Sequence, residues 1–281
     1  MAYKIVADSS ANLQTLNNVD FASVPMRICT AETEFEDTPQ CSVENMVSYL
    51  KKYKGKSSTA CPGIGNWLEA FEGADQIFAV TITSGLSGSF AAASAAAEQY
   101  MEEHPDAKVF VIDSLSAGPE LALIIEKLEE LIGKGLSFEE ICEKITGYQK
   151  RTHLVFCLAS VINFARNGRI NPALAKIVGV LDIRMVGKAS DQGTLQLLHK
   201  CRGAKQSLLK IVNSMKDNGF QGGKVRIAHC FNLEGANKVK ELLLELFPNL
   251  NVKIHECRAL CSFYAEEGGI LVGFEDLSPA L

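Results

Sequence analysis

The segment Ile77–Met101, with the sequence IFAVTITSGLSGSFAAASAAAEQYM, combines the three patterns that decide the fold. Its first six residues are mostly apolar or β-branched, which is typical of a strand buried on both faces. From Phe90 onward the segment is rich in alanine, the strongest helix former. Residues 83–89 lie between these two patterns and contain two glycines. A buried strand, a tight turn and a helix in this order predict one unit of a parallel α/β sheet.

The same unit is predicted at two other places in the first half of the chain. The runs Lys4–Ala7 and Val109–Ile112 each read as a buried strand and each end at an Asp-Ser pair. Helices are predicted over Pro119–Leu131, where proline suits the first turn, and from Ser137 to about Arg151, which opens with a capping box. Strands that alternate with helices predict an N-terminal three-layer α/β/α domain with a parallel sheet.

The second half of the chain predicts a different sheet. Asp191-Gln192-Gly193 is typical of a hairpin turn, so that two neighbouring strands run antiparallel. The expected domains are residues 1–152, parallel α/β, and residues 153–281, α/β with a mixed sheet of about six strands. The strands are predicted at His153–Cys157, Ile183–Ala189, Leu195–Cys201, Val225–Cys230, Val252–Cys257 and Ile270–Phe274, and the helices at Pro172–Leu181, Gly203–Met215 and Glu234–Leu246.

Bulk properties exclude several classes of function. The 281 residues carry a net charge of −5, whereas general nucleic-acid binding requires a basic surface. No apolar stretch reaches the roughly 18 residues of a membrane span, and the N-terminus has none of the features of a signal peptide. The nine cysteines include no C-x-x-C pair, which argues against a disulfide framework. We therefore expect a cytoplasmic protein without stable membrane insertion, nucleic-acid partner, metal or cofactor.

The turn at residues 83–89 is the strongest candidate for chemistry. Gly85 and Gly88 permit a tight turn, and free N–H groups at the following helix favour an anion. Ser84 and Ser87 add hydroxyl donors. The same residues are equally typical of a helix cap, with Ser87 or Ser89 as the capping residue. Neither a P-loop nor a G-x-G-x-x-G motif is present, which argues against a nucleotide.

A second hydroxyl-rich segment, Ser57–Gly63, precedes a helix near Trp67. It reads either as a polar loop with a helix cap or as a second hydroxyl-bearing arm. That arm would face the turn at residues 83–89, which is called the serine turn below.

Five short segments run in order along the chain: Asp8–Leu13 (DSSANL), Ser58–Pro62 (STACP), Ser84–Ser89 (SGLSGS), Asn167–Ile170 (NGRI) and Lys200–Gly203 (KCRG). Together they resemble motifs of the DegV family. In the same order, the family motifs are an opening Asp-Ser-Thr, a Thr-Ser-Gln-Pro loop, a Ser-Gly-Leu-Ser-Gly-Thr turn, a Gly-Gly-Arg-Ile segment and a Lys-x-Arg segment.

The resemblance implies a non-enzymatic carrier with a long-chain fatty acid buried between two domains. Position by position, Thr59 and Ser87 would hold the carboxylate, with Ser84 and Gly85 in the same turn. Tyr264 stands where relatives carry a histidine, and it can still donate a hydrogen bond. Some relatives present the acid to a separate fatty-acid kinase, and Arg202 is the residue expected to dock that partner.

The sequence departs from the family pattern near the expected head group. Ala60 and Cys61 stand in place of serine and glutamine, Glu266 in place of a glycine, and Arg184-Met185 in place of Lys-Pro. These departures affect how the head group is handled more than whether a lipid is bound.

Other constellations leave alternatives open. Cys61 reads as a nucleophile or as a small buried thiol, and the pair Asp8 and Asp113 as acid–base or Mg²⁺-binding carboxylates or as structural ties. With either set the chain would be an enzyme acting on a small acyl or phosphorylated substrate in the same cleft. His255 and neighbouring cysteines lack the spacing of a zinc site. Arg169 reads either as a ligand-neutralising residue or as part of an ion pair.

Overall fold

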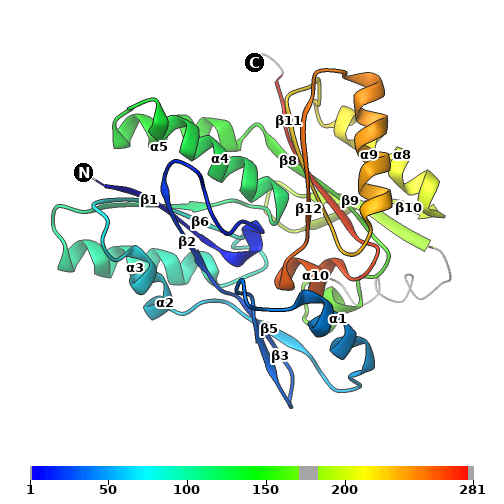
Figure 1. Ribbon diagram of the computed structural model, residues 1–281, viewed down its shortest axis with the longest axis horizontal. Helices are drawn as coiled ribbons and strands as arrows, with labels where there is room; N and C mark the ends of the chain where they lie inside the picture. The colour runs from blue at the N-terminus through cyan, green and yellow to red at the C-terminus, as the bar shows by residue number, and fades with distance from the viewer. Residues whose placement is uncertain (1, 171–182, 278–281) are drawn as a thin grey trace.

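The computed structural model describes residues 2–170 and 183–277, which form three sheets with helices packed on them (Figure 1). The predicted helix Pro172–Leu181 lies outside the described residues. The strands are β1 (Tyr3–Asp8), β2 (Asp20–Val24), β3 (Arg27–Cys29), β4 (Glu34–Glu36), β5 (Ser58–Ala60), β6 (Gln76–Thr81), β7 (Lys108–Asp113), β8 (Thr152–Leu158), β9 (Ile183–Ala189), β10 (Leu195–Arg202), β11 (Lys224–His229), β12 (Asn251–Glu256) and β13 (Ile270–Glu275). The helices are the 3-10 helix η1 (Ser9–Ala11) and α1 (Val43–Lys52), α2 (Ile64–Phe71), α3 (Ser89–Glu103), α4 (Pro119–Gly133), α5 (Phe138–Gln149), α6 (Ile162–Arg166), α8 (Ala204–Asp217), α9 (Leu233–Leu246) and α10 (Ala259–Ala265).

The first sheet is parallel, with the strand order β2-β1-β6-β7. Residues of α2 and α3, such as Trp67 and Ala93, pack on one face. Residues of α4 and α5, such as Leu121 and Ile141, pack on the other. The central strand β6 is buried along its whole length because helices cover both faces. The predicted three-layer α/β/α arrangement is confirmed.

A small antiparallel sheet, β4-β3-β5, was not predicted. Its strands have three residues each and no continuous apolar run, which leaves no strand pattern to detect. Of the two readings of residues 57–63, the polar loop with a helix cap is wrong for Ser58–Ala60, which form β5. The sheet matters for function because β5 carries Thr59.

The second sheet has six strands in the order β10-β9-β8-β13-β11-β12. The β9–β10 hairpin is antiparallel as predicted, and only β11 and β12 run parallel, so the sheet is mixed. Helices α8 and α9 bury residues such as Ile211 and Val239 against one face. The other face carries Leu154, Phe156 and Leu271 toward the first sheet.

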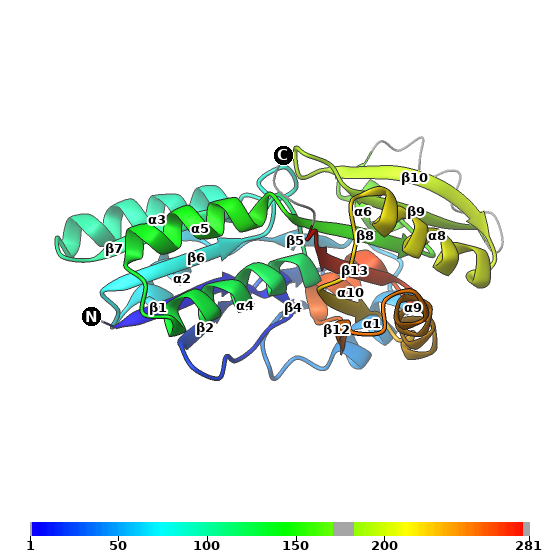
Figure 2. The same cartoon turned by 90° about the horizontal axis from the view of Figure 1, so that it is seen from above.

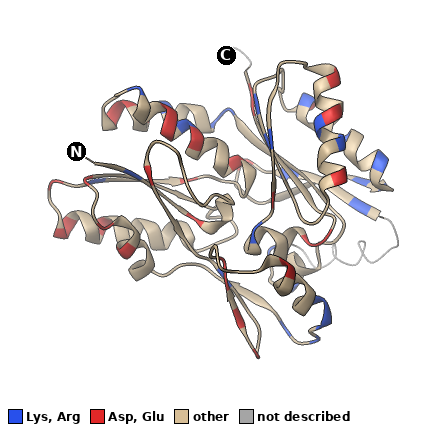
Figure 3. Ribbon diagram, in the orientation of Figure 1, with Lys and Arg blue, Asp and Glu red and all other residues tan. Residues whose placement is uncertain are grey.

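Helix α4 joins the two sheets, which lie side by side in Figures 1 and 2. Gly273 of β13 permits this contact because a Cβ there would lie 2.6 Å from the backbone nitrogen of Glu120. The buried guanidinium of Arg226 donates from Nε to Glu126 of α4 at 2.8 Å. Acidic residues predominate on the helices that cover the parallel sheet, whereas α8 and the β9–β10 hairpin carry mainly basic residues (Figure 3). The division into domains at residue 152 stays a prediction.

Candidate fatty-acid site

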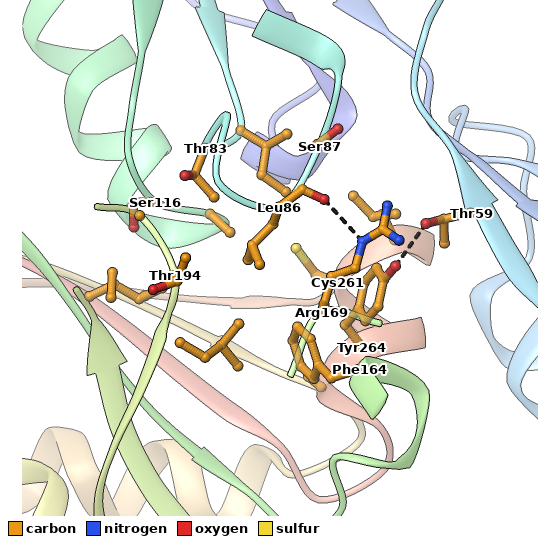
Figure 4. A pocket seen from close by; sticks show the side chains of 18 of the residues that line it. Thr59, Thr83, Leu86, Ser87, Ser116, Phe164, Arg169, Thr194, Cys261 and Tyr264 are labelled. Carbon is orange, nitrogen blue, oxygen red and sulfur yellow. Dashed lines mark hydrogen bonds between the residues drawn. The ribbon is translucent and has the colours of Figure 1, made fainter. Parts of the chain in front are cut away.

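A cavity of about 300 Å³ lies between the six-stranded sheet and the serine turn (Figure 4). Most of its walls are apolar, and they come from the six-stranded sheet, from β5 of the small sheet, from the loops that follow β6 and β7, and from α6 and α10. The apolar and sulfur-bearing lining residues are Met26, Ala60, Cys61, Ile82, Leu86, Ala117, Leu154, Phe156, Leu158, Phe164, Ala189, Leu195, Leu260, Cys261, Ala265 and Leu271. Thr59, Thr83, Ser87, Gly88, Ser116, Arg169, Gly193, Thr194 and Tyr264 complete the lining.

Polar groups converge where β5, α10 and the segment after α6 meet. The hydroxyl oxygen of Thr59 lies 2.7 Å from the phenol oxygen of Tyr264. Arg169 donates from Nε to the carbonyl of Leu86 at 3.1 Å, which holds its guanidinium beside them (Figure 4). Burial raises the pKa of Tyr264, although the Thr59 hydroxyl and the Arg169 charge act in the opposite direction. Tyr264 is therefore a neutral phenol that can donate to an anion.

Ser87 combines the two roles that the sequence left open. Its hydroxyl accepts a hydrogen bond from the backbone N–H of Ser89, the first residue of α3, at 3.3 Å. Ser87 also lines the cavity, and its own O–H hydrogen is not used by that bond. The hydroxyl of Ser89 points elsewhere, because it donates to Asp8 at 2.7 Å.

Ser84 and Gly85 are exposed and do not line the cavity. The backbone N–H of Ser84 instead donates to Asp113 at 3.0 Å. Gly85 is required by packing, because a Cβ there would lie 2.8 Å from the carbonyl oxygen of Gln192 in the β9–β10 turn. Arg202, at the exposed end of β10, is also absent from the lining. A ligand role for Ser84 and Gly85 and a docking role for Arg202 stay predictions.

The two aspartates tie loops together. Fully buried Asp8 accepts from the backbone N–H of Ile82 at 2.8 Å and from the hydroxyl of Ser89. Burial raises its pKa. Asp113 accepts from the backbone N–H groups of Ser84 and Leu115. These contacts match the structural reading of both residues. Across residues 2–170 and 183–277, no cluster of three or more histidine, cysteine or acidic side chains is arranged to hold a metal ion.

Cys61 lies in the cavity wall, next to the polar end. None of the described lining residues is a histidine or a carboxylate, so the described wall offers no general base to activate this thiol.

Sequence reasoning left Arg169 undecided and did not identify the apolar walls. The Asn-Gly-Arg-Ile segment was the only signal for Arg169, since its place depends on packing across 83 residues to Leu86. Many of the lining residues lie on strands. The apolar side of a strand has the same sequence pattern whether it packs on a helix or lines a cavity.

Among the helices that the structure describes, none has the length and apolar character needed to cross a bilayer.

Comparisons with known proteins agree over the full length. A family model described as uncharacterised proteins of the DegV family matches residues 2–276. A DegV domain-containing protein of Streptococcus pneumoniae is 45% identical over 279 residues, which are 98% of this chain and 99% of the relative. A relative from Streptococcus gordonii is 43% identical with the same coverage.

Two solved structures share the whole fold. A DegV family protein from Eubacterium eligens, loaded with heptadecanoic acid, has a TM-score of 0.96 and 43% identity, and the match covers 98% of this chain and 100% of that one. The Streptococcus pneumoniae Fatty Acid Kinase (Fak) B3 protein, loaded with linoleic acid, has a TM-score of 0.96 and 45% identity over 98% and 99% of the two chains. The chain belongs to the DegV family.

Proposed function

We propose that this protein is a non-enzymatic carrier that binds a long-chain fatty acid in the cavity between the six-stranded sheet and the serine turn. The observation that carries the proposal is a largely apolar cavity wall whose one charged residue among those described, Arg169, lies beside the hydroxyls of Thr59 and Tyr264. An apolar tail with a single anionic head matches this distribution. The two similar structures loaded with heptadecanoic and linoleic acid support the same ligand class.

The apolar tail and the carboxylate of the ligand are expected to contribute different amounts to the binding free energy. Burial of a methylene contributes about 0.8 kcal/mol, so a tail with about 14 methylenes contributes about 11 kcal/mol before ordering costs. A hydrogen bond to a charged group contributes roughly 1.5–3 kcal/mol. The tail therefore dominates affinity. Thr59 and Ser87 orient the carboxylate, and Arg169 supplies the positive charge that a buried anion requires.

A carrier of this kind serves a partner that acts on the carboxylate. Similarity to the Fak B3 protein supports presentation of the bound acid to a fatty-acid kinase, with exposed Arg202 as the docking residue. We place this exchange in the cytoplasm.

Native mass spectrometry of the purified protein tests the proposal. We expect an adduct of one C14–C18 acid per chain, which solvent extraction recovers and which delipidated protein rebinds. A chain that shows no adduct, before and after incubation with hexadecanoic, octadecenoic and linoleic acids, is not a fatty-acid carrier.

A further inference from the structure

Glu266 adopts a backbone conformation that side chains other than glycine rarely adopt. It follows directly after α10 with φ 52° and ψ 171°. At positive φ combined with extended ψ the Cβ of any larger residue is crowded, so such residues persist where their surroundings hold them. Its backbone N–H bonds the carbonyl of Ser262 at 3.0 Å, which fixes the residue at the end of the helix.

The side chain of Glu266 accounts for this placement. Its carboxylate accepts a hydrogen bond from the backbone N–H of Asn163 at 3.2 Å. It is largely buried, and contacts with Ser160 and the N–H groups of Asn163 and Ile162 counteract the rise in its pKa that burial causes. Helix α6 begins at Ile162, whose backbone N–H donates to the hydroxyl of Ser160 at 3.2 Å. Val161, the residue directly before the helix, supplies no capping side chain, so the Asn163 N–H depends on Glu266. Glu266 therefore caps α6 from a different part of the chain.

Helix α6 in turn sets the geometry of the head-group site. Its Phe164 ring packs against the ring of Tyr264 with centroids 4.6 Å apart. The side chain of Asn163 donates to the carbonyl of Phe263 at 2.8 Å, a second link between α6 and α10. The backbone N–H of Arg169 bonds the carbonyl of Phe164 at 2.8 Å, so the guanidinium is placed relative to the end of α6.

We infer that Glu266 is a positioning residue for the fatty-acid carboxylate. It holds α6 so that Phe164 supports Tyr264 and Arg169 faces the same point as Thr59. The inference rests on the proposed function and deepens it. Because Glu266 contacts the start of α6 and does not line the cavity, its removal affects recognition of the carboxylate and leaves burial of the tail unchanged.

The test compares hexadecanoic acid with hexadecanol, which has the same tail and no charge. In Glu266→Gly the backbone fits better, but the cap is lost. We expect affinity for the acid to fall about tenfold and affinity for the alcohol to change less than about twofold. Glu266→Ala, which removes the carboxylate but keeps the Cβ, shows the same selective loss. Glu266→Gln retains an oxygen acceptor and restores most of the acid affinity.

Ser137→Ala is the matched control, because Ser137 caps α5 outside the cavity. It lowers thermal stability without changing the ratio of acid to alcohol affinity. The inference is overturned if both Glu266→Gly and Glu266→Ala lose affinity for the acid and for the alcohol by the same factor. It is also overturned if neither variant loses affinity for either ligand. If the unaltered protein binds neither ligand, the proposed function itself fails, and this outcome is distinct from the other two.

Discussion

The hydroxyl of Thr59 and the phenol of Tyr264 lie 2.7 Å apart although 205 residues separate them in sequence. The contact joins β5 of the small antiparallel sheet to α10, which precedes the last strand of the six-stranded sheet. Each hydroxyl can donate only one hydrogen, so the pair shares one donor and leaves one for an anion. The head-group site therefore exists only when both halves of the chain are packed together.

The first prediction concerns Thr59 and Ser87, which both line the cavity. Thr59→Val combined with Ser87→Ala removes two donors without removing much volume. Each lost hydrogen bond to a charged group is expected to weaken binding of hexadecanoic acid by about tenfold or more. Titration calorimetry with delipidated protein measures the loss. Circular dichroism should show a folded protein, and unfolding should show a stability lower by about 1 kcal/mol, because Ser87→Ala also removes the cap of α3.

Ser84→Ala is the control for this prediction. Ser84 belongs to the same turn but is exposed and lies outside the cavity wall. The Ser84→Ala variant should bind the acid with the same affinity as the unaltered protein. A loss in Ser84→Ala, together with unchanged binding in the double variant, places the carboxylate on the outer side of the turn.

The sequence predicted those parts of the fold that adjacent residues encode. The run from β6 to α3 contains a buried strand, a glycine turn and an alanine-rich helix, each encoded by adjacent residues. The hairpin between β9 and β10 was found from its turn residues in the same way. By contrast, β5 pairs with β3 from a distant part of the sequence, with Thr59 opposite Ile28. The β3–β4 hairpin is local, but its strands have only three residues each, so no sequence pattern marks it.

The site was predicted in part for the same reason. Thr59 and Ser87 were found through motifs, and the structure places both in one cavity. That Ser84 faces outward could not be seen, because a turn does not reveal which hydroxyl points to its concave side. Arg169 was left undecided because its position depends on α6, which Glu266 holds from more than 90 residues away.

A second prediction concerns Gly193, at the turn of the β9–β10 hairpin. Gly193 has φ 69°, and a Cβ there would lie 1.9 Å from the hydroxyl of Thr83 and 3.0 Å from the Cα of Leu115. Gly193→Ala forces the hairpin away from the serine turn and opens the cavity wall. We expect about 1–3 kcal/mol lower stability in urea unfolding and faster release of the bound acid.

Gly147→Ala provides the comparison for Gly193. Gly147 is an exposed residue of α5, and a Cβ there meets nothing within 4 Å. This change should stabilise the protein by about 0.5–1 kcal/mol and leave acid release unchanged. Equal release rates in the Gly193 variant and the unaltered protein would show that the hairpin does not close the cavity.

A third prediction uses the Cys61 thiol as a reporter of occupancy. Cys61 is partly exposed and lines the cavity, whereas Cys29 has similar exposure but lies in β3 outside it. A bound acid should slow alkylation of Cys61 by iodoacetamide in delipidated protein, with no effect on Cys29. Peptide mass spectrometry gives both rates in one sample. Protection of neither thiol at saturating acid contradicts the placement of the ligand.

The last prediction concerns Glu120, a carboxyl buried where α4 meets β8. The hydroxyl of Thr152 donates to it at 2.8 Å, and burial raises its pKa from 4.5 to about 7, against the effect of the Ser116 and Thr152 hydroxyls. Between these two values the folded chain holds a proton that the unfolded chain has released. The contribution of Glu120 to the unfolding free energy therefore falls as the pH rises from 4.5 through 7.

By pH 8 this loss amounts to about 3 kcal/mol, since each pKa unit corresponds to about 1.4 kcal/mol. Glu120→Gln keeps a group that can bond Thr152 but has no proton to release. Urea unfolding at pH 5, 6, 7 and 8 should give a flatter profile for this variant, which becomes the more stable protein above pH 7. Glu139→Gln serves as the control, because Lys108 lowers the pKa of exposed Glu139, whose titration therefore lies below this window. If Glu120→Gln reproduces the slope of the unaltered protein, another group is responsible for the pH dependence.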